Sequence, residues 1–228
     1  MEDSFTLSLS GKSSVLEAQY FPSIELPQHK NFVLGLVELL TFNSIPNVDY
    51  SNNKLHLNGD IITVPTGSYE IDAINKFLQD TLKSKGIEFS VKANNNTLRS
   101  EILCSHPIDL TPHDSIGRLL GFTPRILEKN IQHSSDLPVK ILRINALRVE
   151  CNITAGAYIN NKKVHTIHEF FPRVPPGIKI LEVPSHVIYL PVSVKCIDNL
   201  QIRIVDQDGN LVNFRGEEIT IRLHIKSV

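Results

Sequence analysis

The strongest constraint on this chain is the alternation of apolar and polar residues, which is typical of β-strands with one buried face. In the closing stretch the alternate positions are all large aliphatic residues: Ile219, Ile221, Leu223 and Ile225. Similar alternation runs through much of residues 139–228, where prolines and glycines interrupt it at short intervals. Many short strands separated by turn residues predict an all-β sandwich or barrel, a class that includes jelly rolls.

Two short polar segments predict tight turns between neighbouring strands. Asn58-Gly59-Asp60 separates the alternating runs of residues 54–57 and 61–64, and Asn-Gly tolerates the positive φ angles that hairpins need. Residues 206–210, Asp-Gln-Asp-Gly-Asn, separate two further runs in the same way. Residues 31–42 are longer and more apolar, and we expect them to form a central strand.

One amphipathic helix is expected near residues 68–84, because four aliphatic residues recur there at helical spacing: Ile71, Ile74, Leu78 and Leu82. Ser68 is the expected N-cap, since its hydroxyl can accept a hydrogen bond from the first turn. Glu70 adds negative charge near that turn, which the helix dipole favours. Gly86 is the expected stop. The helix is expected to lay its apolar stripe on a sheet.

A shorter second helix is expected to follow Asp114 or Ser115 and to end at Gly121. Asp109, His113 and Asp114 lie close together in this stretch, which invites a catalytic interpretation. However, no nucleophile or oxyanion-stabilising feature accompanies them, and helix capping accounts for Asp114. The sequence also contains none of the common motifs for hydrolases, zinc proteases or nucleotide binding. We therefore predict no catalytic residues and no enzymatic activity.

The helices lie in the front of the chain and the back is almost purely β, which predicts two compact parts. The break is expected near residues 134–138. It separates an N-terminal jelly-roll-like half with the helix, residues 1–135, from a C-terminal jelly-roll-like half, residues 136–228. The predicted fold is thus an all-β jelly-roll sandwich, in its double form.

Composition argues against several partners. The chain has 23 Lys and Arg against 24 Asp and Glu, a formal net charge of -1. Proteins that bind nucleic acid through phosphates carry a basic excess, so no direct nucleic-acid binding is expected. No apolar run approaches the ~20 residues that span a bilayer, so no membrane partner is expected. Cys104, Cys151 and Cys196 are widely spaced without C-x-x-C, which predicts buried free thiols.

Two weak constellations raise the question of a metal. His165, His168 and Glu169 lie close together, but a strand points His168 away from the other two, so the three do not converge on one ion. Asp206 begins a stretch like a calcium loop, and Glu217 stands at the twelfth position. Strands are expected on both sides of it, so we predict a hairpin turn. Neither a metal nor another cofactor is predicted.

Two segments show a resemblance to a known family. Ile62 to Ile71, ITVPTGSYEI, is similar to an I-x-I-P-x-G-S-Y-E-I segment that opens a helix. Ser115 to Phe122, SIGRLLGF, resembles an S-I-G-x-L-L-G-F segment. Both resemble structural proteins of Polinton (Maverick) elements and their adintovirus-like relatives, whose capsid proteins are jelly rolls. In that lineage the major capsid proteins are double jelly rolls that form trimers, and the minor ones are single jelly rolls that form pentamers.

The resemblance implies a structural capsid protein, major or minor, that assembles with itself and with other capsid proteins. It also implies a location in a virion or virus-like particle, made in the host cytoplasm. The proline-rich segment 172–184 is a stiff loop suited to a subunit contact, so Asp at Val174 or Ile178 is expected to block assembly without unfolding the monomer. Arg215 and Glu217, in a charged turn, are further candidate contacts.

Two alternatives remain open at the level of sequence. The first is a β-sandwich module that binds a ligand or receptor, such as a fibre head. The second is a metalloenzyme on a cupin-type jelly roll, in which His and Glu side chains on facing strands hold a metal.

Overall fold

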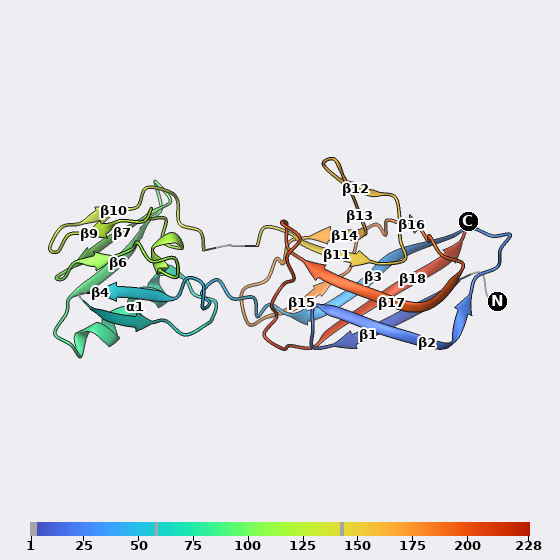
Figure 1. Cartoon of the computed structure of the whole chain (residues 1–228), viewed down its shortest axis with the longest axis horizontal. Helices are drawn as coiled ribbons and strands as arrows, with labels where there is room; N and C mark the ends of the chain where they lie inside the picture. Colours follow the sequence, from blue (N-terminus) through green and yellow to red (C-terminus); the bar gives the residue numbers. More distant parts are fainter. Residues whose placement is uncertain (1–3, 58, 142–143) are drawn as a thin grey trace. The chain divides into compact units, whose positions relative to one another are not determined.

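A computed structural model describes residues 4–57, 59–141 and 144–228. The chain divides into two compact units, which are shown in Figure 1: Met1–Ile45 with Ile144–Val228, and Pro46–Arg143. Each unit has its own hydrophobic core, and the two cores share no residue. The second unit is therefore an insertion into the first.

The first unit is a sandwich of two antiparallel sheets. One sheet has the order β1-β18-β3-β15, with bounds Ser4–Gly11, Ile219–Ser227, Phe32–Phe42 and Lys179–Glu182, and β16 (Leu190–Pro191) also pairs with β3. The other has the order β14-β11-β17-β2, with bounds Thr166–Phe170, Leu147–Cys151, Cys196–Val205 and Val15–Glu25.

This strand order is that of one jelly roll. Lettered B to I in chain order, the eight long strands form the sheets B-I-D-G and C-H-E-F. The predicted all-β jelly-roll sandwich with one helix is confirmed. The described strands supply one jelly roll, in the first unit, and the second unit has a different topology from the second jelly roll that was expected.

The alternation of the closing strand decides which face of β18 is buried. Ile219, Ile221, Leu223 and Ile225 are all fully buried, as the pattern predicted. The polar residues between them face outward, because successive side chains of a strand point to opposite faces. In the centre of its sheet, β18 pairs with β1 on one side and with β3 on the other.

The second unit combines two small sheets with one helix. The four-stranded sheet has the order β5-β4-β8-β9, with bounds Asp60–Thr63, Lys54–Leu57, Ile108–Asp109 and Ile126–Leu127. The three-stranded sheet has the order β10-β7-β6, with bounds His133–Ser134, Arg99–Cys104 and Phe89–Asn94. Helix α1 (Ile71–Lys83) packs against β6 and buries the predicted stripe.

The division of the chain differs from the predicted halves, 1–135 and 136–228. The first three strands belong with the C-terminal part, because β18 lies between β1 and β3. Strand pairing across more than 200 residues, such as Ser4 with Lys226, leaves no trace in a local pattern. Only the position at which the chain returns to the jelly roll, Ile144, lies near the predicted break.

The helix begins later than predicted. Ser68 is not its N-cap: α1 starts at Ile71, and Glu70 holds the cap position without a side-chain cap bond. The residues before the helix make hydrogen bonds with another segment. The side-chain amide of Asn47 accepts a hydrogen bond from the Tyr69 N–H at 2.9 Å and donates one to the Tyr69 carbonyl at 2.7 Å. Gly67 likewise bridges to Val48. These contacts keep residues 67–69 out of the helix.

Three other local predictions can be checked. Ser115 caps a short 3₁₀ helix, Ile116–Arg118, by accepting a hydrogen bond from the Gly117 N–H at 3.2 Å. The hairpin of β4 and β5 is confirmed, with Gly59 at φ +90°, although Asn58 lies outside the described residues. The alternating stretch that begins at residue 139 contains strand β11 over Leu147–Cys151, and its residues 142 and 143 lie outside the described part of the chain.

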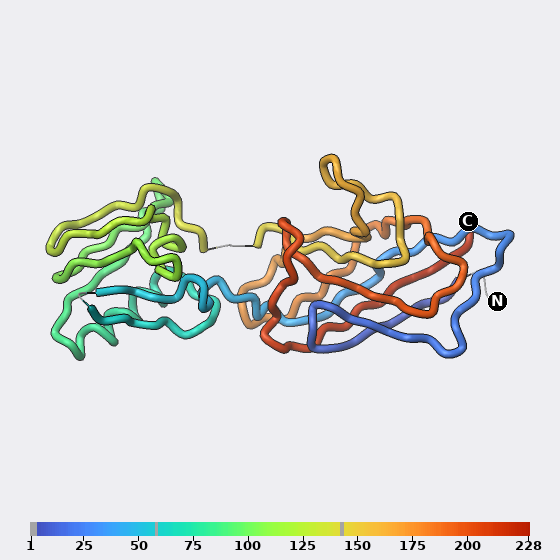
Figure 2. Tube along the Cα trace, in the orientation of Figure 1, coloured from blue at the N-terminus to red at the C-terminus, as the bar shows by residue number. Residues whose placement is uncertain are grey.

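Between β11 and β14 the chain forms a small hairpin, β12 (Ala157–Ile159) and β13 (Lys162–Val164), that projects from the body of the jelly roll (Figure 2). Asn160 in its turn has φ +52°, a conformation that Asn adopts more readily than most residues. Among the described residues no helix is long and apolar enough to cross a bilayer.

Candidate assembly surface

Four connections of the jelly roll meet at one end of the sandwich, which we call the loop end. They are the turn 11–15, the connection from Ile45 to Ile144 that contains the second unit, the loop 171–178 and the loop 206–218. In an antiparallel sandwich, alternate connections fall at the same end. The loop end therefore gathers segments that are far apart in the sequence.

Two polar residues at the end of β3 join these loops. The Asn43 N–H donates to the Ile178 carbonyl at 2.9 Å, and the Asn43 side-chain amide donates to the Val174 carbonyl at 2.7 Å. The Ser44 hydroxyl donates to the Phe214 carbonyl at 2.5 Å. Sequence reasoning missed both residues, because a polar pair after a strand is an ordinary turn signal.

The four predicted contact residues thus come from two loops at the same end. Val174 and Ile178 lie in loop 171–178, and Arg215 and Glu217 lie in loop 206–218. Ile178, Arg215 and Glu217 are exposed. Val174 is half-buried against the jelly-roll core, so an Asp at this position is expected to weaken the fold as well.

An exposed apolar surface adjoins loop 171–178. Its members lie on or beside the edge strand β15 and are 42, 52, 60 and 58% exposed: Phe42, Ile178, Leu181 and Val183. The strand register places Leu181 opposite Leu40 on the outer face of the sheet. We call these four residues the apolar strip. Contiguous exposed apolar residues with a polar rim are typical of interaction sites.

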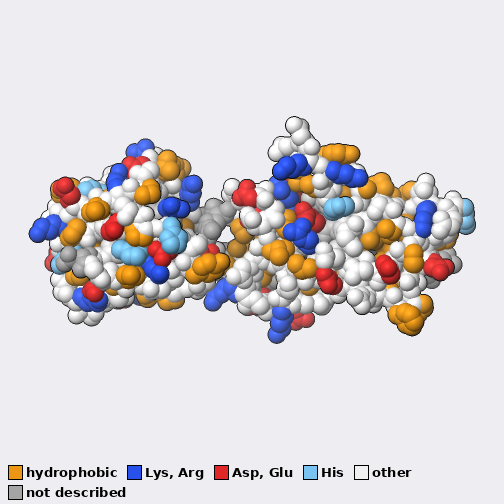
Figure 3. All heavy atoms as spheres, viewed as in Figure 1, with side chains coloured by type: hydrophobic (Ala, Val, Ile, Leu, Met, Phe, Trp, Pro, Cys, Tyr) orange, Lys and Arg blue, Asp and Glu red, His pale blue; other side chains and the backbone are white. Residues whose placement is uncertain are grey.

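The outer face of the other sheet has a different character, because its charges are paired across strands. Arg203 Nη1 lies 3.1 Å from Glu150 Oε2, and Arg148 Nε lies 3.0 Å from Glu169 Oε2. Figure 3 shows acidic and basic side chains mixed over the visible face of this unit. Charges neutralised within the chain suit a solvated face rather than an apolar contact.

The histidines considered as metal ligands do not converge. His168 Nε2 lies 2.9 Å from Glu182 Oε1, whereas His165 Nδ1 contacts the Thr154 carbonyl at 2.7 Å and Glu169 pairs with Arg148. Among the described residues no group of three His, Cys, Asp or Glu side chains is arranged to hold a metal ion. The cupin alternative therefore gains no support from the geometry.

The stretch compared with a calcium loop is a tight turn. Asp206 Oδ1 accepts hydrogen bonds from the Asp208 N–H at 2.8 Å and from the Asn210 N–H at 2.9 Å. Val205 bridges to Leu211 across the turn. The carboxylate thus satisfies backbone donors, as Asp does in many turns.

In the second unit Asp114 forms an ion-pair cluster instead of a helix cap. Lys54 Nζ lies 2.7 Å and His56 Nε2 lies 3.3 Å from its carboxylate. The hydrogen bond from Lys54, followed by that from His56, lowers the pKa of Asp114. His113 is exposed, and it is His56 that approaches Asp114.

Asp109 lies opposite His56 on β8, and its pKa is lowered by hydrogen bonds from Thr111.

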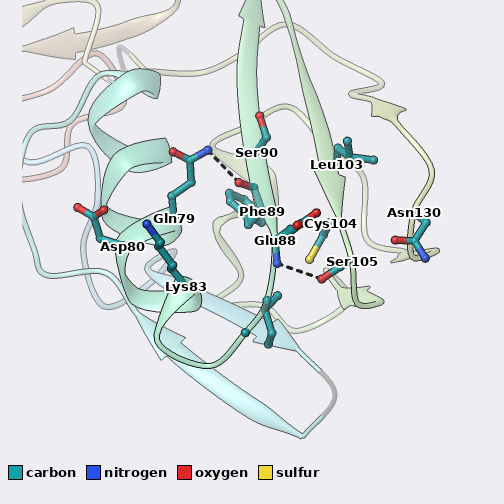
Figure 4. A pocket seen from close by; sticks show the side chains of 12 residues that line it. Gln79, Asp80, Lys83, Glu88, Phe89, Ser90, Leu103, Cys104, Ser105 and Asn130 are labelled. Atoms are coloured by element: carbon teal, nitrogen blue, oxygen red, sulfur yellow. Dashed lines mark hydrogen bonds between the residues drawn. The ribbon is translucent and has the colours of Figure 1, made fainter.

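A hollow of about 830 Å³ lies in the second unit, between α1 and strands β6 and β7 (Figure 4). Two of its polar groups bond within the protein: the Gln79 amide donates to the Phe89 carbonyl at 2.9 Å, and the Glu88 N–H donates to Ser105 Oγ at 3.0 Å. Burial raises the pKa of the Cys104 thiol at its wall, which disfavours a reactive thiolate.

The prediction of buried free thiols is confirmed for two of the three cysteines. Cys104 and Cys151 are buried and free, and burial raises the pKa of Cys151 to about 11. Cys196 is also free but exposed, at the start of β17, so the prediction was wrong for this residue.

Comparison with solved structures bears on the fold. The structure is similar to the crystal structure of the mavirus penton protein, with a TM-score of 0.52. The match covers 99% of this chain and 100% of that chain at 13% sequence identity. The sequence matches no model of a known protein family, and no curated protein matches it. At this identity the likeness shows a shared fold, which extends over both units of the chain.

Proposed function

We propose that this chain is a structural capsid protein that self-assembles through its jelly roll. The observation that carries the proposal is the likeness to the mavirus penton protein over the full length of both chains, insertion included. The apolar strip supports it, because a jelly roll that works alone in water has no need of four exposed apolar residues at one edge.

A minor, penton-type role is favoured over a major one. The described strands form one jelly roll, and in the Polinton lineage that the chain resembles, the minor capsid proteins are the single jelly rolls. The expected assembly is a homo-oligomer, a pentamer, that contacts other capsid proteins in a virion. Synthesis in the host cytoplasm is part of the same proposal. A catalytic role has no positive support, since the described His, Asp and Glu clusters are occupied by their own ion pairs and turns.

Ile178→Asp tests whether the apolar strip supports self-assembly. The exposed side chain leaves room for Asp, and the hydrogen bond from Asn43 goes to the Ile178 backbone, so the monomer is expected to stay folded. A charge buried in an interface without a partner costs several kcal/mol, and assembly is expected to weaken by roughly a hundredfold or more. The measurement is molar mass by light scattering across a concentration series.

Ile61→Asp is the matched control, because Ile61 is 57% exposed against 52% for Ile178 and lies in the second unit. It is expected to assemble like the wild type. If Ile178→Asp assembles at the same concentrations as the wild type, the apolar strip does not take part in self-assembly. A wild type that remains a monomer would reject the capsid proposal and favour a binding module.

A further inference from the structure

The two lateral sides of the jelly roll differ in charge and in apolar surface. One side carries the edge strands β15 and β14, and the other carries the edge strands β1 and β2. On the basis of the proposed function, we infer that copies associate head to tail, the β15 side of one copy packing on the 206–218 loop side of the next.

Loop 206–218 lies nearer to the side of β1 and β2 than loop 171–178 does. It connects two central strands, β17 and β18, whose neighbours on that side are the edge strands β2 and β1. Its contacts agree: the Ile204 N–H donates to the Ser14 carbonyl at 2.8 Å, and the Ser14 hydroxyl donates to the Val212 carbonyl. Gly11, at the end of β1, pairs with Ile219 directly after the loop. Loop 171–178 joins the edge strands β14 and β15, so it lies nearer to the other side.

The β15 side carries two exposed cations, Arg173 and Lys179. The exposed carboxylate of Glu169, on β14, lies 3.0 Å from Arg148, so that charge is balanced within the chain. The nearby carboxylate of Glu182 is held by His168 at 2.9 Å, and the ring of His168 is only 14% exposed. Lys179 also lies opposite Phe42 of the apolar strip, so the exposed charge borders the apolar surface.

The 206–218 side carries an acidic excess. Its carboxylates are Asp206, Asp208, Glu217 and Glu218, against the cations Arg215 and Lys12. Asp206 is used to close its own turn, whereas Asp208, Glu217 and Glu218 are exposed. An exposed apolar residue, Leu211, lies beside them and is 51% exposed.

Each of the two surfaces therefore has exposed apolar residues beside exposed charges. The exposed charges are basic on the β15 side and acidic on loop 206–218. Two β15 sides facing each other would oppose Lys179 to Lys179, and like charges across an interface are costly. The acidic surface of a second copy is complementary to the basic β15 side. Because the two surfaces are different, the contact is heterologous and generates a closed ring or an open filament.

The test is a charge swap in the full-length chain. Lys179→Glu alone, and Glu217→Lys with Glu218→Lys alone, are each expected to raise the concentration needed for assembly by roughly tenfold or more. The triple variant carries both changes and restores opposite charges across the contact, so it is expected to recover wild-type assembly. Lys76→Glu, a charge reversal on the exposed face of α1, is the control and should leave assembly unchanged.

A mixture gives a second test that does not depend on the triple variant. Leu181→Asp blocks the β15 side and Leu211→Asp blocks the loop side, so neither variant is expected to assemble alone. Mixed together, each retains the surface that the other lacks, and head-to-tail packing predicts heterodimers and nothing larger.

The outcomes separate the inference from the proposed function. If the wild type assembles but the charge variants assemble as well as it does, or the mixture gives no dimer, the head-to-tail contact is wrong and the capsid proposal stands. If the wild type is a monomer at every concentration, both are overturned.

Discussion

At the scale of single residues, the best-defined electrostatic site is the carboxylate of Asp136. It accepts hydrogen bonds from the Thr123 N–H at 2.9 Å and hydroxyl at 2.8 Å, and Arg125 Nη1 lies 2.6 Å away. The Thr123 bonds and then the Arg125 charge lower the pKa of Asp136 from an ordinary 3.8 to about 2. The residue joins the segment after the 3₁₀ helix to the stretch that follows β10.

This pKa predicts how stability depends on pH. A carboxyl group whose pKa is lower in the folded state stabilises that state above its unfolded pKa, and the contribution is lost as pH falls through the folded pKa. Asp136→Asn is expected to lower the melting temperature at pH 7, and the deficit is expected to shrink between about pH 5 and pH 2. Thermal unfolding at several pH values measures it. Asp80→Asn, at an exposed position on α1, is the control, and a deficit that is the same at every pH would contradict the assignment.

Sequence reasoning reached some of these residues and not others. Ser115 could be predicted as a cap because capping depends on neighbours a few positions away. Ile178, Arg215 and Glu217 could be proposed as exposed contacts from proline and charge patterns. That their loops share one end, joined through Asn43 and Ser44, depends on tertiary pairing and could not be predicted.

At the scale of elements, the second unit depends on a glycine turn after the 3₁₀ helix. Gly121 has φ +85°, and a Cβ there would lie 2.2 Å from the Leu137 carbonyl oxygen. The close approach of the two backbones allows a hydrogen bond, in which the Leu137 N–H donates to the Gly121 carbonyl at 2.9 Å. The turn therefore requires both a left-handed conformation and the absence of a side chain.

A pair of glycine substitutions separates the two requirements. Gly209 has φ +87°, and a Cβ there meets nothing within 4 Å. Gly209→Ala is expected to cost about 1–2 kcal/mol from backbone strain alone. Gly121→Ala has the same strain plus the overlap, so its loss should be larger by at least about 1 kcal/mol. Urea unfolding of both variants measures the difference, and equal losses would show that the Leu137 segment moves aside.

Elements with a long regular pattern were predictable, and short ones were not. The alternation of β18 and the helical stripe of α1 identified both elements and their buried faces. Strands β8, β9 and β10 have two residues each, too few for a period to appear. The start of α1 was misplaced because Asn47, far back in the chain, holds Tyr69.

At the scale of the whole molecule, the jelly roll is closed by contacts between the two ends of the sequence. Its buried core is drawn from residues 7–39 and 147–225, and the core of the second unit is drawn from residues 48–127. A local pattern shows where strands lie but not which strands pair. For this reason the class of fold could be predicted, whereas the insertion between β3 and β11 could not.

The separate cores predict that the insertion is dispensable for folding. A chain in which a short flexible Gly/Ser linker replaces residues 46–143 is expected to keep a folded jelly roll, since loop closure costs little and no buried core residue is lost. Near-native far-ultraviolet circular dichroism and one cooperative unfolding transition would support this. An unfolded product would show that the jelly roll needs the second unit.

The central claim is that this jelly roll functions by assembling with itself. Sedimentation equilibrium of the wild-type chain, over a wide concentration range and at low and high salt, tests it most directly. If the jelly roll assembles with itself, the mass rises with concentration to a fixed integer multiple of 25.6 kDa. Association is expected to be weaker at high salt, because salt screens the exposed charges at the contact. A mass of 25.6 kDa at every concentration and salt would contradict it.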